Sequence, residues 1–91
     1  MRYRESFYKC GVTEDEAEQA LKWDICYPIH DGPRGNKQLL YVGVTETGKL
    51  LEIGVEVDYE EEWAFHARKK ASSKSKKCLE RQLRRLGLRL Y

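Results

Sequence analysis

Two apolar segments joined by a short polar turn constrain the fold of this chain most strongly. Residues 38–45 and 50–57 flank Glu-Thr-Gly-Lys at 46–49, and this arrangement predicts a β-hairpin. The first segment is apolar on both faces, which is typical of a central strand. In the second, apolar residues alternate with polar or small ones such as Glu52 and Glu56, so we expect one side of that strand to face water.

Two short helices are predicted before the hairpin. Residues 2–9 form the first, and Gly11 supplies the left-handed conformation that commonly ends a helix. Thr13 and Glu16 have the spacing of a capping box, in which each side chain accepts a hydrogen bond from the backbone of the other residue. This pair predicts the start of a second, amphipathic helix that ends near Trp23.

Residues 63–68 form the last predicted strand, and its two faces differ in chemistry. Successive side chains of an extended chain point to opposite faces of a sheet. The core-facing set is Trp63, Phe65 and Ala67. The opposite set is Ala64, His66 and Arg68. Pairing this strand with residues 50–57 through their apolar faces brings the two glutamates of that segment to the side of His66 and Arg68. Such a face is either a salt-linked solvent surface or a reaction surface.

The C-terminal part of the chain combines a helix pattern with a high density of positive charge. A Lys/Ser-rich stretch at 69–77 predicts a mobile linker, and Leu79, Leu83 and Leu86 then recur at helical spacing. Gly87 ends this helix. The helix either covers the sheet with its charges in water or binds RNA or another acidic partner.

With one more strand at residues 26–30, these elements predict an α+β fold. It consists of two short N-terminal helices, an antiparallel β-sheet of three to four strands and a basic C-terminal helix. The 91 residues leave room for one hydrophobic core, so we expect a single domain spanning residues 1–91. Residues 72–91 form its basic C-terminal helix and tail.

The net charge of +2 conceals a strong asymmetry along the chain. Residues 1–62 contain seven Lys and Arg against fourteen Asp and Glu, a net charge of −7, whereas residues 63–91 contain ten against one, a net charge of +9. A basic block at one end of a folded domain attracts polyanions through its field and through counterion release. Alternatively, the two parts neutralise each other within the fold or across a dimer.

The cysteines and the hydropathy pattern exclude several classes of protein. Cys10, Cys26 and Cys78 are odd in number and far apart, and no CxxC motif occurs, so we expect neither a disulfide framework nor a structural zinc site. No apolar run approaches the roughly 20 residues of a membrane helix, and no signal-peptide pattern is present at the N-terminus. We therefore expect a cytoplasmic protein that does not associate with membranes.

Three blocks of sequence resemble one family. Residues 9–17 (K-C-G-V-T-E-D-E-A) are similar to the K-H-G-V-(S/T)-x-x-E-A stretch of BrnT-type toxins, in the RelE-like superfamily. Residues 43–51 (G-V-T-E-T-G-K-L-L) resemble that family's G-x-T-x-x-G-R-L-L hairpin, and residues 65–69 (F-H-A-R-K) resemble its (I/V)-(S/H)-A-R-(K/R) strand end. The blocks occur in the family's order and cover roughly residues 7–71.

The resemblance implies a RelE/BrnT-like fold and a specific activity. Such toxins are small endoribonucleases, ribosome-associated or free, that an antitoxin silences. The antitoxin often carries a ribbon-helix-helix DNA-binding part. We therefore expect RNA and a cognate antitoxin protein as partners of a type II toxin–antitoxin toxin. Cys10 stands where the family has a histidine, and the acidic segment at 59–62 is longer than is usual in the family.

Metal-free RNA cleavage has requirements that a few residues of this chain can meet. The ribose 2′-hydroxyl attacks phosphorus, so a base, an acid and a cation beside the phosphorane are needed. His66 can carry a proton near neutral pH, and Arg68 can bind two phosphate oxygens at once. Glu52 can act as a base or orient His66, and under the resemblance Lys9 adds positive charge. We predict that these four residues form the catalytic site, with no metal and no cofactor.

The same hypothesis assigns RNA binding to basic residues around the predicted site. They are Arg34, Lys69, Lys70, Lys76, Lys77, Arg81, Arg84 and Arg85. Other interpretations stay open, because His66 can be structural and Arg68 can serve only to pair with a glutamate. The chain can also be a non-catalytic nucleic-acid-binding module. A third interpretation is a protein-interaction domain whose basic helix docks an acidic partner, as a monomer or a homodimer.

Overall fold

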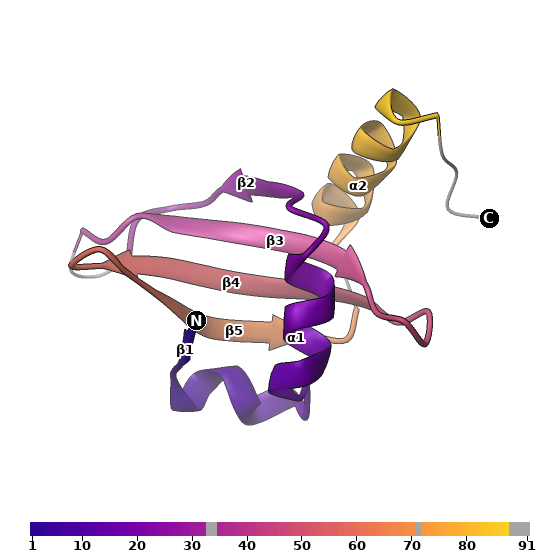
Figure 1. The fold of residues 1–91 in the computed structure, drawn as a ribbon. Helices are drawn as coiled ribbons and strands as arrows, with labels where there is room; N and C mark the ends of the chain where they lie inside the picture. Colours follow the sequence, from indigo (N-terminus) through magenta and orange to yellow (C-terminus); the bar gives the residue numbers. More distant parts are fainter. Residues whose placement is uncertain (33–34, 71, 88–91) are drawn as a thin grey trace.

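A computed structural model describes residues 1–32, 35–70 and 72–87. Its elements, shown in Figure 1, are β1 (Arg2–Tyr3), the 3₁₀-helix η1 (Glu5–Cys10), α1 (Glu14–Leu21), β2 (Cys26–Pro28), β3 (Gln38–Val44), β4 (Leu50–Asp58), β5 (Glu61–Arg68) and α2 (Ser73–Arg85). The fold is therefore α+β, as predicted. Arg34, which we predicted to bind RNA, lies outside the described residues.

The five strands form one open, mixed sheet in the order β1-β5-β4-β3-β2. Strand β1 runs parallel to β5, and the other neighbours are antiparallel. The prediction of three to four antiparallel strands was therefore wrong in number and in type. The additional strand is β1, whose two residues lie in the segment that we predicted to be helical. A two-residue strand is too short to show any periodicity, so its pairing with β5 leaves no signal in the sequence.

The predicted hairpin is present as β3 and β4. Tyr41 of β3 pairs with Ile53 of β4, and Val44 pairs with Leu50 next to the turn. At the turn itself the Thr45 amide donates to the Lys49 carbonyl at 2.9 Å. The hairpin brings β4 to the centre of the sheet, between β3 and β5.

The predicted capping box is also present at the start of α1. The Thr13 side chain accepts a hydrogen bond from the Glu16 amide, and the Glu16 carboxylate accepts one from the Thr13 amide, both at 3.1 Å. Gly11 has a φ of 73° and ends η1, which is shorter than predicted and of the 3₁₀ type. The helix α1 ends at Leu21, two residues before the predicted Trp23.

Helix α1 covers one face of the sheet, which we call the α1 face, and η1 lies along β5 and adds Phe7 to the same core (Figure 1). Its core contains Phe7, Val12, Ala17, Ala20, Leu51, Ile53, Val55, Ala64 and Ala67. The helix approaches β3 closely at Gly43, where a Cβ would lie 2.2 Å from the Ala20 carbonyl oxygen. Glycine is therefore required there because any side chain would separate α1 from the sheet.

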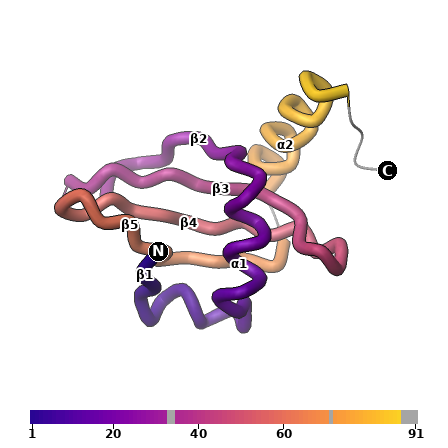
Figure 2. The backbone as a smooth tube through the Cα atoms, in the orientation of Figure 1, coloured from indigo at the N-terminus to yellow at the C-terminus, as the bar shows by residue number. Residues whose placement is uncertain are grey.

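Helix α2 packs on the opposite face, which we call the α2 face, and only at one end of it. A second core of Ile25, Val42, Leu79 and Leu83 joins the helix to β3. The remainder of α2 extends away from the sheet (Figures 1 and 2). The helix begins at Ser73, so part of the predicted linker at 69–77 is helical. Leu86, which we predicted to lie on the apolar stripe, is 68% exposed because the helix has left the sheet by that point.

A β-bulge in β5 changes which of its side chains face the core. The pairing shifts between Gly54 and Val55, so that Ala67 pairs with Ile53 while Ala64 pairs with Val55. Both alanines are buried in the core of the α1 face, whereas Trp63 and Phe65 are only partly buried. The prediction that Trp63, Phe65 and Ala67 share the core face was wrong, because the extra residue of the bulge inverts the alternation.

The polar side of β4 does not face water. Glu52 is 3% exposed and Glu56 is 7% exposed. The N-terminal end of α2 covers Glu52, whereas Arg4 pairs with Glu56. The expectation of a solvent-facing side was wrong because elements distant in the sequence cover it.

The close approach at Gly43 gives a stability prediction. Gly43→Ala should lower the free energy of unfolding by about 1–3 kcal/mol, because the added methyl group meets backbone atoms of Ala20 that cannot rotate away. Urea denaturation measures the effect. The control is Gly32→Ala, whose methyl group meets side-chain atoms alone, the terminal amide of the flexible Gln38 at 2.8 Å and a Glu56 carboxylate oxygen at 3.6 Å, and should cost less stability. Equal stability of the Gly43→Ala variant and the wild type would contradict the assignment of α1 packing.

Candidate functional site

His66 and Arg68 lie on the α2 face of the sheet, beside Glu52. The register of β4 and β5 pairs Arg68 with Glu52 and His66 with Gly54. Residues two apart on one strand and their direct cross-strand partners share a face. The predicted clustering of the imidazole, the guanidinium and the Glu52 carboxylate is therefore present. Among the ion pairs of the described residues, none involves Arg68, so a purely structural pairing of Arg68 with a glutamate is not seen there.

The bulge and Gly54 set the position of His66. A Cβ at Gly54 would lie 2.9 Å from Cζ of Phe65 and 3.0 Å from Cβ of His66. Phe65 therefore lies over Gly54 on the α2 face, and the Phe65 and His66 ring centroids are 6.3 Å apart. The phenyl ring restricts the imidazole on one side. The His66 side chain nevertheless remains 38% exposed and accessible to a ligand.

Glu52 holds the N-terminal end of α2 against the sheet. Its Oε2 accepts hydrogen bonds from the Ser72 amide at 3.1 Å and from the Ser75 hydroxyl at 2.6 Å. Its other oxygen, Oε1, lies 3.7 Å from Nε2 of His66. One carboxylate oxygen thus binds the helix while the other faces the imidazole.

The charge of Glu52 is stabilised despite its burial. Burial alone would raise the pKa of this carboxyl group. The hydrogen bonds from Ser75 and Ser72, with a smaller contribution from His66, oppose that effect and hold the Glu52 pKa below its ordinary value of 4.5. Glu52 is therefore a carboxylate at neutral pH, and its low pKa makes it a weak base.

A hydrogen-bond chain extends this arrangement to the edge strand β2. The Tyr27 hydroxyl lies 2.7 Å from Oγ of Ser75, and Ser75 is fully buried. Because the single hydroxyl proton of Ser75 is donated to Glu52, the Tyr27 hydroxyl donates to Ser75. Lys74 stacks over the Tyr27 ring with Nζ 4.9 Å from the centroid. Sequence analysis missed Ser72, Ser75 and Tyr27, because nothing in their spacing connects three segments that meet only in the folded chain.

Glu56, the second glutamate of β4, belongs to a separate cluster at the other end of the strand. Arg4 forms ion pairs with both Glu56 and Asp58. The Arg4 guanidinium also stacks on Trp63, 4.4 Å from the ring centroid. Glu56 shares the sheet face of His66, as predicted. Its charge, however, is neutralised by Arg4, and it makes no ion pair with His66 among the described residues.

Lys9 belongs to a different element from His66. It is exposed on η1, a helix that packs against the α1 face through Phe7. Lys69, predicted to bind RNA, reaches toward the same helix, with its Nζ 3.5 Å from the position of a Cβ on Gly11. Lys69 thus lies near the η1–α1 junction, where Lys9 is two residues before Gly11.

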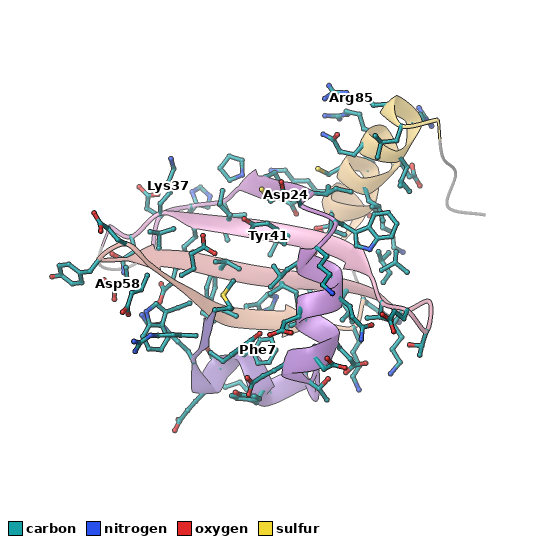
Figure 3. All side chains as sticks on the ribbon, viewed as in Figure 1. Phe7, Asp24, Lys37, Tyr41, Asp58 and Arg85 are labelled. Carbon is teal, nitrogen blue, oxygen red and sulfur yellow. The ribbon has the colours of Figure 1, made fainter. Side chains whose placement is uncertain are left out.

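The predicted RNA-binding residues of α2 are all exposed. They are Lys76, Lys77, Arg81, Arg84 and Arg85. Figure 3 shows Arg85 near the tip of the helix, at the end that lies away from the sheet. Lys70, just after β5, is exposed as well. The helix thus presents a row of exposed cations that begins at the Glu52 end of the site.

Metal-binding clusters and membrane-spanning helices are both absent from the residues that the structure describes. Within these residues, no group of three or more His, Cys, Asp or Glu side chains could hold a metal ion. None of the helices in the same part of the chain is long and apolar enough to span a membrane. A hollow of about 260 Å³ lies between the end of α1 and the β3–β4 turn, lined by Trp23 and Lys22 among others, and His66 is not part of its wall.

No protein-family model matches the chain, and comparisons with curated proteins and with solved structures find no match either. The resemblance to BrnT-type toxins therefore depends on the three sequence blocks alone.

The role of Glu52 gives a pH-dependent prediction. Glu52→Gln should lower the free energy of unfolding at pH 7 by about 1–2 kcal/mol, because two charge-assisted hydrogen bonds become neutral ones. A carboxyl group with a lowered folded pKa contributes stability above its unfolded pKa, here 4.5, and loses it as the pH falls through the folded pKa. The difference between variant and wild type should therefore shrink in urea denaturation at pH 3.

Glu18→Gln is the matched control, since Glu18 is exposed on α1 and should give little difference at either pH. A Glu52→Gln effect of the same size at pH 7 and pH 3 would show that the carboxylate charge does not stabilise the docking of α2.

Proposed function

We propose that this protein is a toxin-like, metal-independent endoribonuclease of a type II toxin–antitoxin pair. The observation that carries the proposal is the partly exposed imidazole of His66 beside Arg68, on one sheet face and next to a basic helix. Proton transfer and phosphate binding are the two chemical tasks of metal-free RNA cleavage, and these side chains suit them.

In the proposed reaction His66 transfers the proton. The imidazole accepts the proton of the ribose 2′-hydroxyl while the 2′-oxygen forms a bond to phosphorus. The bond between phosphorus and the 5′-oxygen then breaks, and the imidazolium returns the proton to that leaving oxygen. The products are a 2′,3′-cyclic phosphate and a 5′-hydroxyl. Arg68 stabilises the negative charge that accumulates on the phosphorane oxygens.

The burial of Glu52 narrows its proposed role. A buried carboxylate that already accepts two hydrogen bonds through one oxygen is poorly placed to take a proton from RNA. We therefore assign Glu52 to positioning His66 and not to acting as the base. Lys9 lies on a helix of the other face, so we assign it to contact with the flanking RNA backbone or with the antitoxin.

The three BrnT-like blocks contact one another in the folded chain. Lys49 in the second block forms an ion pair with Glu16 in the first, with 3.0 Å between Nζ and Oε2. Lys69 in the third block lies beside Gly11 in the first. Segments that resemble one family and are far apart in sequence thus lie side by side. The proposal includes a RelE/BrnT-like fold, a cytoplasmic location and a cognate antitoxin. In many such pairs the antitoxin has a ribbon-helix-helix part.

Substitution of the site residues tests the proposed activity. His66→Ala should lower the rate of cleavage of single-stranded RNA by about 100-fold or more, through loss of proton transfer. Arg68→Ala should lower it by about 100-fold, through loss of charge stabilisation. The rate is measured in the presence of a metal chelator, and circular dichroism checks that the fold is retained.

His30→Ala is the control, because His30 is exposed in the loop after β2 and should not affect cleavage. Induced expression should arrest growth for the wild type and for the control but not for the two site variants. Co-expression of an antitoxin from a neighbouring reading frame should restore growth. Full cleavage by both site variants would refute the site.

The second candidate function is non-catalytic binding of nucleic acid by α2. It is favoured by the exposed cations of the helix, among which Lys77, Arg81 and Arg84 recur at i, i+4 and i+7 on one side. RNA binding that persists without cleavage would support it over the endoribonuclease.

Salt dependence tests whether α2 binds the phosphate backbone under either function. Replacing Lys77, Arg81 and Arg84 by Gln should reduce the slope of log K against log salt by about 2 for single-stranded RNA, because each phosphate that is no longer neutralised removes about 0.7. The slope is measured by fluorescence anisotropy. Replacing Lys22 and Lys37, which are exposed elsewhere, should change it little. An unchanged slope in the α2 variant would exclude this helix from the interface.

A further inference from the structure

The hydrogen bonds around Glu52 distinguish its two oxygens. Oε2 is occupied by the Ser72 amide and the Ser75 hydroxyl, both of which belong to the start of α2. Ser75 is in turn held by the Tyr27 hydroxyl. Hydrogen bonds in such a chain polarise one another, so the carboxylate has a fixed orientation. Oε1 is the oxygen left for His66, and the orientation of α2 determines where it points.

The position of Oε1 has a consequence for the imidazole. At 3.7 Å the Nε2 atom of His66 is too far for a normal hydrogen bond but close enough for a strong electrostatic effect beside a buried charge. A neutral imidazole carries one proton, either on Nε2 or on Nδ1. An N–H group directed at a carboxylate is favourable, whereas a nitrogen lone pair directed at it is unfavourable.

We propose that α2, acting through Ser75 and Glu52, keeps the proton of neutral His66 on Nε2 and leaves Nδ1 as the nitrogen that exchanges protons with a ligand. Ser75 and Tyr27 are positioning residues in this scheme, since both act through Glu52. The catalytic consequence rests on the proposed function: Nδ1 takes the 2′-hydroxyl proton and returns it to the 5′-oxygen, while the proton on Nε2 stays in place. The tautomer itself requires no RNA.

The tautomer is measured by long-range ¹H–¹⁵N correlation NMR of the full chain at a pH where His66 is neutral. The chain contains two histidines, so His30, exposed in a loop, is an internal reference, and a His30→Gln variant assigns the signals. In the wild type the Nε2–H form of His66 should predominate. A predominant Nδ1–H form would overturn the proposal.

Glu52→Gln gives the decisive comparison. The amide oxygen of the glutamine must face Ser75 and Ser72, which both donate, so its NH₂ group faces His66. A donor in that position favours a lone pair on Nε2. The ratio of the two tautomers should shift by about tenfold toward Nδ1–H, which corresponds to about 1.4 kcal/mol. An unchanged ratio would overturn the proposal.

Glu56→Gln is the matched control, because it makes the same change on the same strand and face but beside Arg4. It should leave the His66 tautomer unchanged, and an equal shift in this variant would overturn the proposal. Ser75→Ala and Tyr27→Phe should shift the ratio in the same direction as Glu52→Gln but by less, because each weakens the anchor and retains the charge. If the tautomer ratio in Ser75→Ala equals that of the wild type, α2 does not act on His66 and the proposal is overturned.

Cleavage assays on the same proteins separate the two proposals. If the wild type does not cleave RNA but shows the Nε2–H form and its reversal in Glu52→Gln, the endoribonuclease is refuted and the tautomer assignment stands. If the wild type cleaves RNA while the tautomer of His66 is indifferent to Glu52, the endoribonuclease stands and the assignment fails.

Discussion

The buried carboxylate of Glu52 is the interaction on which both α2 and the candidate site depend. It lies in the central strand β4, and one of its oxygens accepts hydrogen bonds from the Ser72 amide and the Ser75 hydroxyl at the start of α2. A buried charge without such partners would cost several kcal/mol. The hydrogen bonds from α2 therefore offset the free-energy cost of burying the carboxylate. The same carboxylate is the anion that lies next to His66. The Glu52 side chain thus contributes both to the stability of the fold and to the chemistry of the candidate site.

The β-bulge is the second constraint, because it lets β5 contribute alanines to the core of the α1 face and place Phe65 and His66 on the α2 face. Before the bulge, Ala64 faces the core of the α1 face, and after it Ala67 does so again. Between them Phe65 and His66 both lie on the α2 face, over a glycine that leaves them room. Bulges commonly redirect a side chain at a functional site. Here the result is a partly exposed imidazole next to Arg68, at the point where the basic segment begins.

The strong charge asymmetry of the chain becomes a spatial separation in the fold. Arg4 neutralises Glu56 and Asp58 at one end of β4, far from α2. At the other end the cations of α2 are exposed and extend from the sheet (Figure 3). The Lys and Arg ion pairs of the described residues all lie within residues 1–62, so the basic part of the chain is not seen to neutralise the acidic part there, and the cations of α2 stay exposed.

The sequence by itself determined the features that depend on residues close together in the chain. The β3–β4 hairpin, the Thr13–Glu16 capping box and the glycine that ends η1 were predictable, because each follows from interactions within a few residues. It also indicated that His66, Arg68 and Glu52 share a face, because side chains alternate along residues 50–57 and 63–68 and the two strands were paired through their apolar faces. Only the tertiary structure decided the strand β1, the bulge in β5, the burial of Glu52 and the partnership of Ser75 with Tyr27. These features arise from contacts between segments distant in sequence, and the energy of such contacts depends on which surfaces the folded chain brings together.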